Sequence, residues 1–209
     1  MPLNKEIDLT LDTSRVIGLI APQSYGKTTL LHLFAEIYSR YINVFVFDTD
    51  FERMRTYGDL SKNMHFIYPK DATMPKEVFL NETIKYIRSK YSNIAIIIED
   101  YDKFLISRGK NTKNDAIYTL ASDSRHQRIA LIYTSKTPAY IPTTLRLNTN
   151  LFFIGKFTDT ANYTYIKKML PNNNMYDTLN KHEFVMIDNY TNTYSKIKYN
   201  LDKNTIYEV

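Results

Sequence analysis

The chain has 209 residues, of which 44% are hydrophobic, so it has room for one α/β domain and is too apolar to be disordered throughout. It has no cysteine, which excludes a disulfide framework, a zinc site built on thiolates and a cysteine nucleophile. The longest uninterrupted apolar run, Ile94 to Ile98, is far shorter than the roughly 20 residues that span a bilayer. The N-terminus also lacks the apolar stretch of a signal peptide, so we expect an intracellular protein without a transmembrane segment.

The formal charge of +5 is unevenly distributed along the chain. Residues 1–104 carry 13 basic and 14 acidic side chains, whereas residues 105–209 carry 14 basic and 8 acidic side chains. The net charge is therefore −1 in the first half and +6 in the second. This asymmetry permits a polyanionic partner that faces the second half of the chain. A solvated basic surface explains the same asymmetry, and charge alone does not decide between the two.

Short β-branched runs alternate with segments of helical periodicity, which is typical of a mostly parallel sheet flanked by helices. Strands are expected at residues 15–20, 44–47, 64–68, 94–98, 129–134 and 151–155. Helices are expected at residues 27–41, 75–91 and 116–121. Residues 183–199 are expected to form a β-hairpin that turns near Asp188 and Asn189.

Residues 21–28, with the sequence APQSYGKT, lie between the first expected strand and the first expected helix. They match the phosphate-binding loop G-x-x-x-x-G-K-[ST] except at the first position, where Ala21 replaces glycine. In such a loop backbone N–H groups converge on a phosphate, the lysine reaches the β- and γ-phosphates, and the hydroxyl binds Mg²⁺. We expect a nucleoside triphosphate to be held by Ala21, Pro22, Gln23, Ser24, Tyr25, Gly26, Lys27, Thr28 and Thr29.

Two carboxylates, Glu99 and Asp100, follow the most apolar strand. In P-loop enzymes that hydrolyse a nucleotide, one acid at such a strand end orients Mg²⁺ and the next polarises the attacking water. The usual order is Asp then Glu, and the reversed order here places Glu99 at the metal beside Thr28 and makes Asp100 the base. A shift of one residue would instead give the metal to Asp100 and leave the base unassigned. The chain has neither an Asn-Lys-x-Asp nor an Asp-x-x-Gly motif, which argues against guanine specificity.

Several short motifs surround the expected strand at residues 129–134. The sequence SRH (124–126) precedes this strand, SKTP (135–138) follows it, and LRLN (145–148) precedes the last core strand. In the order and spacing of these motifs, over about residues 15–199, the chain resembles the FtsK–HerA family of P-loop ATPases. Within that family it is most similar to the genome-packaging ATPases of membrane-containing icosahedral double-stranded DNA viruses.

The resemblance implies a single P-loop ATPase domain over residues 1–209, with a core at about 15–157 and a C-terminal helix and hairpin at about 158–209. It implies that ATP hydrolysis with Mg²⁺ drives double-stranded DNA into a preformed capsid. The expected assembly is a ring of five or six copies docked on portal or vertex proteins of the capsid. The protein is then expected in the host cytoplasm and at the packaging vertex of the virion.

The resemblance also implies roles for single residues in the second half of the chain. Arg125 matches an arginine finger, which stabilises transition-state charge in a neighbouring subunit, and Arg128 and Arg146 are alternatives. Lys136 occupies the sensor position, where glutamine is usual. A lysine can contact the γ-phosphate but cannot accept a hydrogen bond from the attacking water, so Ser135 is an alternative sensor.

Residues 105–136 carry six basic and two acidic side chains. We predict that Arg108, Lys110 and Lys113 contact DNA phosphates in the channel of a ring, and a solvated loop is the alternative. Two other functions stay open. One is a filamentous-phage-type assembly ATPase, although such proteins typically carry a membrane segment. The other is a catalytically weak nucleotide-binding structural module.

Overall fold

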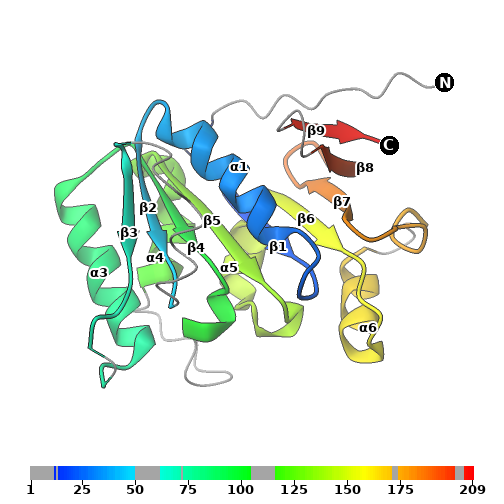
Figure 1. Cartoon of the computed structure of the whole chain (residues 1–209), viewed down its shortest axis with the longest axis horizontal. Helices are drawn as coiled ribbons and strands as arrows, with labels where there is room; N and C mark the ends of the chain where they lie inside the picture. The colour runs from blue at the N-terminus through cyan, green and yellow to red at the C-terminus, as the bar shows by residue number, and fades with distance from the viewer. Residues whose placement is uncertain are drawn as a thin grey trace.

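One mixed sheet runs through the part of the chain that the computed structural model describes, namely residues 12, 14–49, 62–71, 73–104, 116–170, 174–200 and 205–209. The nine strands of these segments follow the order β3-β2-β4-β5-β1-β6-β7-β8-β9 (Figure 1). Six are parallel: β1 (Val16–Ile20), β2 (Asn43–Phe47), β3 (Met64–Ile67), β4 (Ile94–Ile98), β5 (Ile129–Ser135) and β6 (Leu151–Gly155). Three are antiparallel: β7 (Glu183–Asp188), β8 (Thr193–Asn200) and β9 (Thr205–Glu208).

Most residues of the parallel strands are apolar, as expected where helices cover both faces of a sheet. Every residue of β1, β4, β5 and β6 is buried. Each of the six strands predicted from the sequence is confirmed, and no strand end differs from its prediction by more than one residue. The mostly parallel, helix-flanked fold is therefore confirmed.

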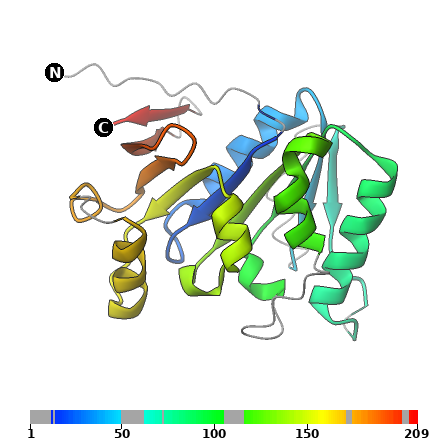
Figure 2. The same ribbon diagram turned by 180° about the vertical axis from the view of Figure 1, so that it is seen from behind.

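Helices pack on both faces of the sheet. Helix α1 (Lys27–Ser39) covers the face seen in Figure 1, where Leu30 and Phe34 enter one hydrophobic core. The opposite face, seen in Figure 2, carries α4 and α5. The remaining helices are α3 (Lys76–Lys90), α4 (Ala116–Gln127), α5 (Thr143–Asn148), α6 (Thr160–Met169) and the 3₁₀ helices η2 (Tyr101–Phe104) and η3 (Pro138–Tyr140).

The C-terminal strands continue the parallel sheet from β6 outward. Strand β7 pairs antiparallel with β6, and β7 and β8 form the hairpin that the sequence predicts. The turn of this hairpin follows Asp188, as expected. Strand β9, which the sequence analysis did not predict, pairs with β8 and gives the hairpin a third strand.

Two helices end more than one residue from their predicted ends, and α3 ends one residue early, at Lys90. Helix α1 ends at Ser39, and Tyr41, which was expected on its apolar stripe, is 70% exposed. Helix α4 continues past Ala121 to Gln127, so SRH (124–126) forms its last turn. None of the helices in the described segments is long and apolar enough to cross a bilayer.

Candidate active site

The predicted functional residues meet at the carboxyl edge of the sheet. Residues 21–26 connect β1 to α1, Glu99 and Asp100 follow β4, and Lys136 follows β5 (Figure 1). Strand β5 lies between β4 and β1, and all three are parallel, so their carboxyl ends are adjacent. The N–H of Ala21 donates to the carbonyl of Ser135 at 3.2 Å, which joins the loop directly to the end of β5.

The backbone of residues 21–28 suits a phosphate-binding loop. Ser24 and Gly26 have positive φ angles of 57° and 99°, and α1 begins at the next residue, Lys27. Among the described side chains none caps the N-terminus of α1 and none in its first turn is acidic. No described side chain therefore competes with an anion for the N–H groups at the start of α1.

Ala21 fits the first position of the loop because a glycine on another strand makes room for its side chain. A Cβ atom at Gly155 on β6 would lie 2.7 Å from Ala21 Cβ and 2.6 Å from the ring of Tyr25. The positive φ angles of the loop fall at Ser24 and Gly26, not at Ala21, so alanine brings no backbone strain. Alanine in place of the first glycine of the motif is therefore compatible with the fold of this loop.

Lys27 is held inside the loop as a buried cation. Its Nζ donates to the carbonyls of Ala21 and Pro22 at 2.7 and 2.8 Å. Burial lowers the pKa of Lys27 to about 8, although the carboxylate of Asp100 acts in the opposite direction. A bound phosphate group would place a full negative charge beside Lys27 Nζ, whereas the two carbonyl oxygens carry only partial charges.

Thr28 and Glu99 contact each other across the site. Thr28 Oγ1 donates to Glu99 Oε1 at 2.6 Å, and Glu99 is only 1% exposed. A hydroxyl and a carboxylate are oxygen ligands of the kind that Mg²⁺ prefers, and Mg²⁺ on a nucleotide needs only one or two protein ligands. Within the described ranges no three His, Cys, Asp or Glu side chains form a metal cage. The residues present therefore fit Mg²⁺ bound together with phosphates.

Asp100 lies against two lysines. Its Oδ2 is 3.0 Å from Lys103 Nζ and 3.4 Å from Lys136 Nζ. Its φ angle of 49° is unusual for a residue other than glycine, and its N–H donates to Thr134 Oγ1 at 2.7 Å. The structure thus brings the predicted base and the predicted sensor together, and it adds Lys103, which the sequence analysis did not single out.

Asp102 is a third carboxylate of the site, which was not predicted from the sequence. Its two oxygens accept hydrogen bonds from the Ser135 hydroxyl at 2.6 Å and from the N–H groups of Lys136 and Thr137 at 3.0 and 3.1 Å. Burial raises the pKa of Asp102, and the bond from Ser135 acts in the opposite direction. Asp102 therefore fixes the backbone of the segment that carries Lys136. Only its place two residues after the predicted pair could have drawn attention to it.

Tyr25 ties the phosphate loop to the C-terminal part of the chain. Its hydroxyl donates to the carbonyl of Asn180 at 2.7 Å, and its own carbonyl lies 3.1 Å from His182 Nδ1. Its ring packs edge-on against Phe184 on β7, with 5.3 Å between the centroids. These contacts join residues more than 150 positions apart, so no local sequence pattern predicts them.

The structure does not describe the side chains of the predicted arginine finger and of the predicted DNA-contact residues. Arg125 belongs to the last turn of α4, and its side chain lies outside the described part of the structure. Arg108, Lys110 and Lys113 fall between residues 105 and 115, also outside the described residues. Of the alternative fingers, Arg146 stacks over the ring of Tyr165, with its Cζ 5.6 Å from the centroid.

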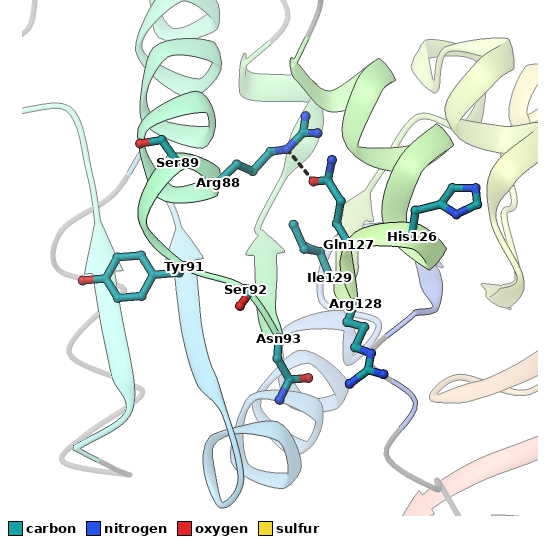
Figure 3. A pocket seen from close by; sticks show the side chains of 9 residues that line it. All are labelled: Arg88, Ser89, Tyr91, Ser92, Asn93, His126, Gln127, Arg128 and Ile129. Carbon is teal, nitrogen blue, oxygen red and sulfur yellow. Dashed lines mark hydrogen bonds between the residues drawn. The ribbon is translucent and has the colours of Figure 1, made fainter.

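A pocket of about 550 Å³ lies at the amino ends of β4 and β5 (Figure 3). Arg88 Nε donates to Gln127 Oε1 at 2.9 Å. The rings of Tyr91 and His126 point to opposite sides in Figure 3, and Arg128 points away from Arg88. The labelled side chains do not converge on one ligand, and the pocket lies at the opposite end of the strands from the phosphate loop.

No protein-family model matches the chain, and no curated protein matches its sequence. Its fold does match solved structures. B204, the DNA-packaging ATPase from Sulfolobus Turreted Icosahedral Virus, has a TM-score of 0.72 and 16% identity, over 89% of this chain and 98% of that one. The genome packaging NTPase B204 from Sulfolobus turreted icosahedral virus 2, in complex with ATP-γS, has a TM-score of 0.70 and 15% identity over the same shares.

A third match is the pCW3 conjugation coupling protein TcpA with ATP-γS. It has a TM-score of 0.64 and 14% identity, over 93% of this chain and 64% of that one. At such low identities these likenesses establish the fold. The chain therefore has the P-loop ATPase fold of these proteins, as its resemblance to the FtsK–HerA family predicts.

Proposed function

We propose that this protein is a genome-packaging ATPase, which hydrolyses ATP to move double-stranded DNA into a preformed viral capsid. The observation that carries the proposal is the 2.6 Å contact between Thr28 and Glu99 beside an uncapped phosphate loop. This is the arrangement in which P-loop enzymes hold Mg²⁺ on a nucleotide. The likeness of the fold to B204 supports the packaging role, and the ATP-γS complex of B204 supports ATP as the nucleotide.

Each residue at the carboxyl edge has a role in this proposal. Lys27 Nζ leaves the carbonyls of Ala21 and Pro22 and pairs with the β- and γ-phosphates. N–H groups of the loop bind the phosphate oxygens. Thr28 and Glu99 hold Mg²⁺, which neutralises phosphate charge when it is bound. Asp100 orients the attacking water and takes its proton.

Arg125 acts on a neighbouring copy of the chain in this proposal. It lies in the last turn of α4, just before β5, whereas the phosphate loop lies beside the far end of that strand. Strand β5 has 7 residues and spans roughly 20 Å at about 3.3 Å per residue, so Arg125 cannot reach the site of its own chain. A ring of five or six copies would bring it to the next site.

The proposed ring surrounds DNA and docks on portal or vertex proteins of the capsid. Its channel is lined by the loop that carries Arg108, Lys110 and Lys113, and the three side chains contact DNA phosphates without reading the bases. The protein then works in the host cytoplasm and at the packaging vertex of the virion. The basic second half of the chain, with a net charge of +6, supports this orientation toward DNA.

Steady-state ATP hydrolysis, measured with and without double-stranded DNA, tests the proposal. We expect DNA to stimulate hydrolysis and Lys27→Ala to abolish it, because the buried cation of the loop is lost. Lys85→Ala, which removes an exposed lysine paired with Glu82 on α3, is the matched control and should keep wild-type turnover. Normal turnover of Lys27→Ala would refute the site. Nucleotide binding without turnover, with or without DNA, would instead identify a catalytically weak nucleotide-binding module.

The DNA-contact loop has a separate test. Replacing Arg108, Lys110 and Lys113 with alanine should reduce the salt dependence of DNA-stimulated hydrolysis, because each lost phosphate contact lowers the slope by about 0.9. Basal hydrolysis should not change. The control removes the same charge from three exposed lysines of α3, Lys76, Lys85 and Lys90. A salt slope that stays the same in the loop variant would contradict the DNA contact.

A further inference from the structure

The Asp100 carboxylate is shared by two lysines that reach it from different elements. Both lysines contact the same oxygen, Oδ2, at 3.0 Å for Lys103 and 3.4 Å for Lys136. The Asp100 side chain is only 9% exposed, so water screens these charges little. Two cations therefore contact one oxygen of Asp100. In the proposed function, the same carboxylate has to hold the attacking water.

The two lysines differ in how firmly they are held. Lys103 belongs to the same turn as Asp100, since its N–H donates to the Asp100 carbonyl at 2.8 Å. Lys136 comes from the segment after β5 and makes the longer contact, and its side chain is 37% exposed against 27% for Lys103. The backbone of Lys136 is fixed by Asp102, so a change in its contacts requires only a side-chain rotation.

Lys136 also follows a residue that contacts the phosphate loop. The residue before it, Ser135, accepts the N–H of Ala21 at 3.2 Å, and the Ala21 carbonyl in turn accepts Lys27 Nζ at 2.7 Å. Lys136 is close enough to help lower the pKa of Lys27, after the larger effect of burial. The charges of Lys27 and Lys136 are therefore close enough to interact, and an anion between them would attract both.

We propose that Lys136 exchanges partners during the ATPase cycle, from Asp100 in the nucleotide-free protein to the γ-phosphate when ATP is bound. The proposal rests on the proposed function, because it needs a triphosphate in the loop. Departure of Lys136 opens one side of Asp100 Oδ2 to the attacking water, while Lys103 keeps the carboxylate in place. ADP has no γ-phosphate, so it leaves Lys136 on Asp100. In this exchange Lys136 leaves Asp100 only when the substrate is present.

Calorimetric titration with Mg²⁺-ADP and Mg²⁺-ATP-γS tests the exchange by binding rather than by turnover. Lys136→Met should weaken ATP-γS binding about tenfold and change ADP binding less than about twofold, because only the γ-phosphate loses a partner. Asp100→Asn should tighten ATP-γS binding, because Lys136 no longer has to leave a carboxylate. Lys103→Met, which removes the same charge from the same oxygen, is the matched control and should change the ratio of the two affinities far less than Lys136→Met.

The double variant Asp100→Asn with Lys136→Met separates exchange from simple repulsion between Asp100 and the γ-phosphate. If Lys136 exchanges partners, Asp100→Asn should tighten ATP-γS binding in a protein that keeps Lys136 but not in the Lys136→Met variant. Equal tightening without Lys136, or no tightening, would overturn the proposal. So would a Lys136→Met variant that weakens both nucleotides equally or neither. Lys136→Gln repeats the measurement if the methionine variant does not fold. A wild-type protein that binds neither nucleotide would contradict the proposed function itself.

Discussion

At the scale of single residues, the phosphate loop depends on a glycine that lies outside it. Ala21 occupies the position where the common motif has glycine, and Gly155 on β6 leaves the space that Ala21 Cβ and the Tyr25 ring fill. The two strands are paired one residue earlier, at Ile20 and Ile154, so the sheet register brings these positions together. Residues 21 and 155 therefore have to be considered as a pair.

Gly155→Ala tests this pair. The new Cβ would lie 2.6 Å from the Tyr25 ring and 2.7 Å from Ala21 Cβ, so the loop has to shift. We expect the free energy of unfolding to fall by about 1–3 kcal/mol and ATP-γS binding to weaken at least about tenfold. Chemical denaturation and calorimetry measure the two effects.

Gly18→Ala is the control for Gly155→Ala. Its Cβ would lie 2.7 Å from the Tyr133 hydroxyl and 2.9 Å from Phe152, in the middle of β1 and away from the loop. A similar loss of stability with unchanged nucleotide affinity is expected. If both variants weaken binding equally, general destabilisation explains the effect and the pairing of Ala21 with Gly155 does not.

Sequence motifs predict the residues of the site that lie in one local segment. Lys27, Thr28 and Glu99 are found from spacing alone, because a loop between strand and helix and an acid after an apolar strand are local patterns. Gly155 and Lys103 are not found in this way, since their importance depends on which strands are neighbours. Strand order is a property of the folded sheet and not of any short segment.

At the scale of elements, Asp102 joins the ends of two neighbouring strands. It lies on η2, which follows β4, and it accepts three hydrogen bonds, one from Ser135 at the end of β5 and two from Lys136 and Thr137 just after it. Two strands that pair along their length are thus also tied together beyond their ends. This connection fixes the backbone of Lys136 relative to Asp100.

Asp102→Ala should lower the free energy of unfolding by about 2–3 kcal/mol, because two N–H groups and a hydroxyl lose their acceptor. Denaturant titration measures this change. Asp102→Asn should recover part of the stability, because its amide oxygen can still accept from the N–H groups of Lys136 and Thr137. An alanine variant as stable as the wild type would show that these bonds do not order the segment after β5.

The sequence predicts the parallel strands better than the outer ones. Strand β4 is predicted to the residue because it is a continuous apolar run, and such runs mark strands covered on both faces. Strand β9 was not predicted because it has only four residues, of which Ile206 alone is buried. A short edge strand carries too little periodicity to be recognised before its partner β8 is known.

At the scale of the whole molecule, the length of β5 separates the phosphate loop from the proposed arginine finger. The phosphate loop lies at the carboxyl edge and Arg125 precedes β5 at the amino edge. Since both groups are needed for hydrolysis in the proposed function, a complete site requires two copies of the chain. A single copy should bind nucleotide and turn it over poorly.

Mixing two inactive variants tests this arrangement. Lys27→Ala lacks a working loop and Arg125→Ala lacks the finger, so each alone should be inactive. In a mixed ring, the loop of an Arg125→Ala copy faces the finger of a Lys27→Ala copy, and part of the hydrolysis should return. Steady-state ATPase measurements over a range of mixing ratios follow the recovery. Mixtures that stay inactive although the copies assemble would place the finger elsewhere.

The contacts of Tyr25 with Asn180, His182 and Phe184 join the C-terminal segment to the phosphate loop. Strands β8 and β9 form one border of the sheet, and β7 connects this border to the Tyr25 contacts. In the proposed function, a force applied at that border would pass through these contacts to the phosphate loop. A chain shortened before residue 180 would lose the partners of Tyr25. We expect the remaining core to bind ATP less tightly.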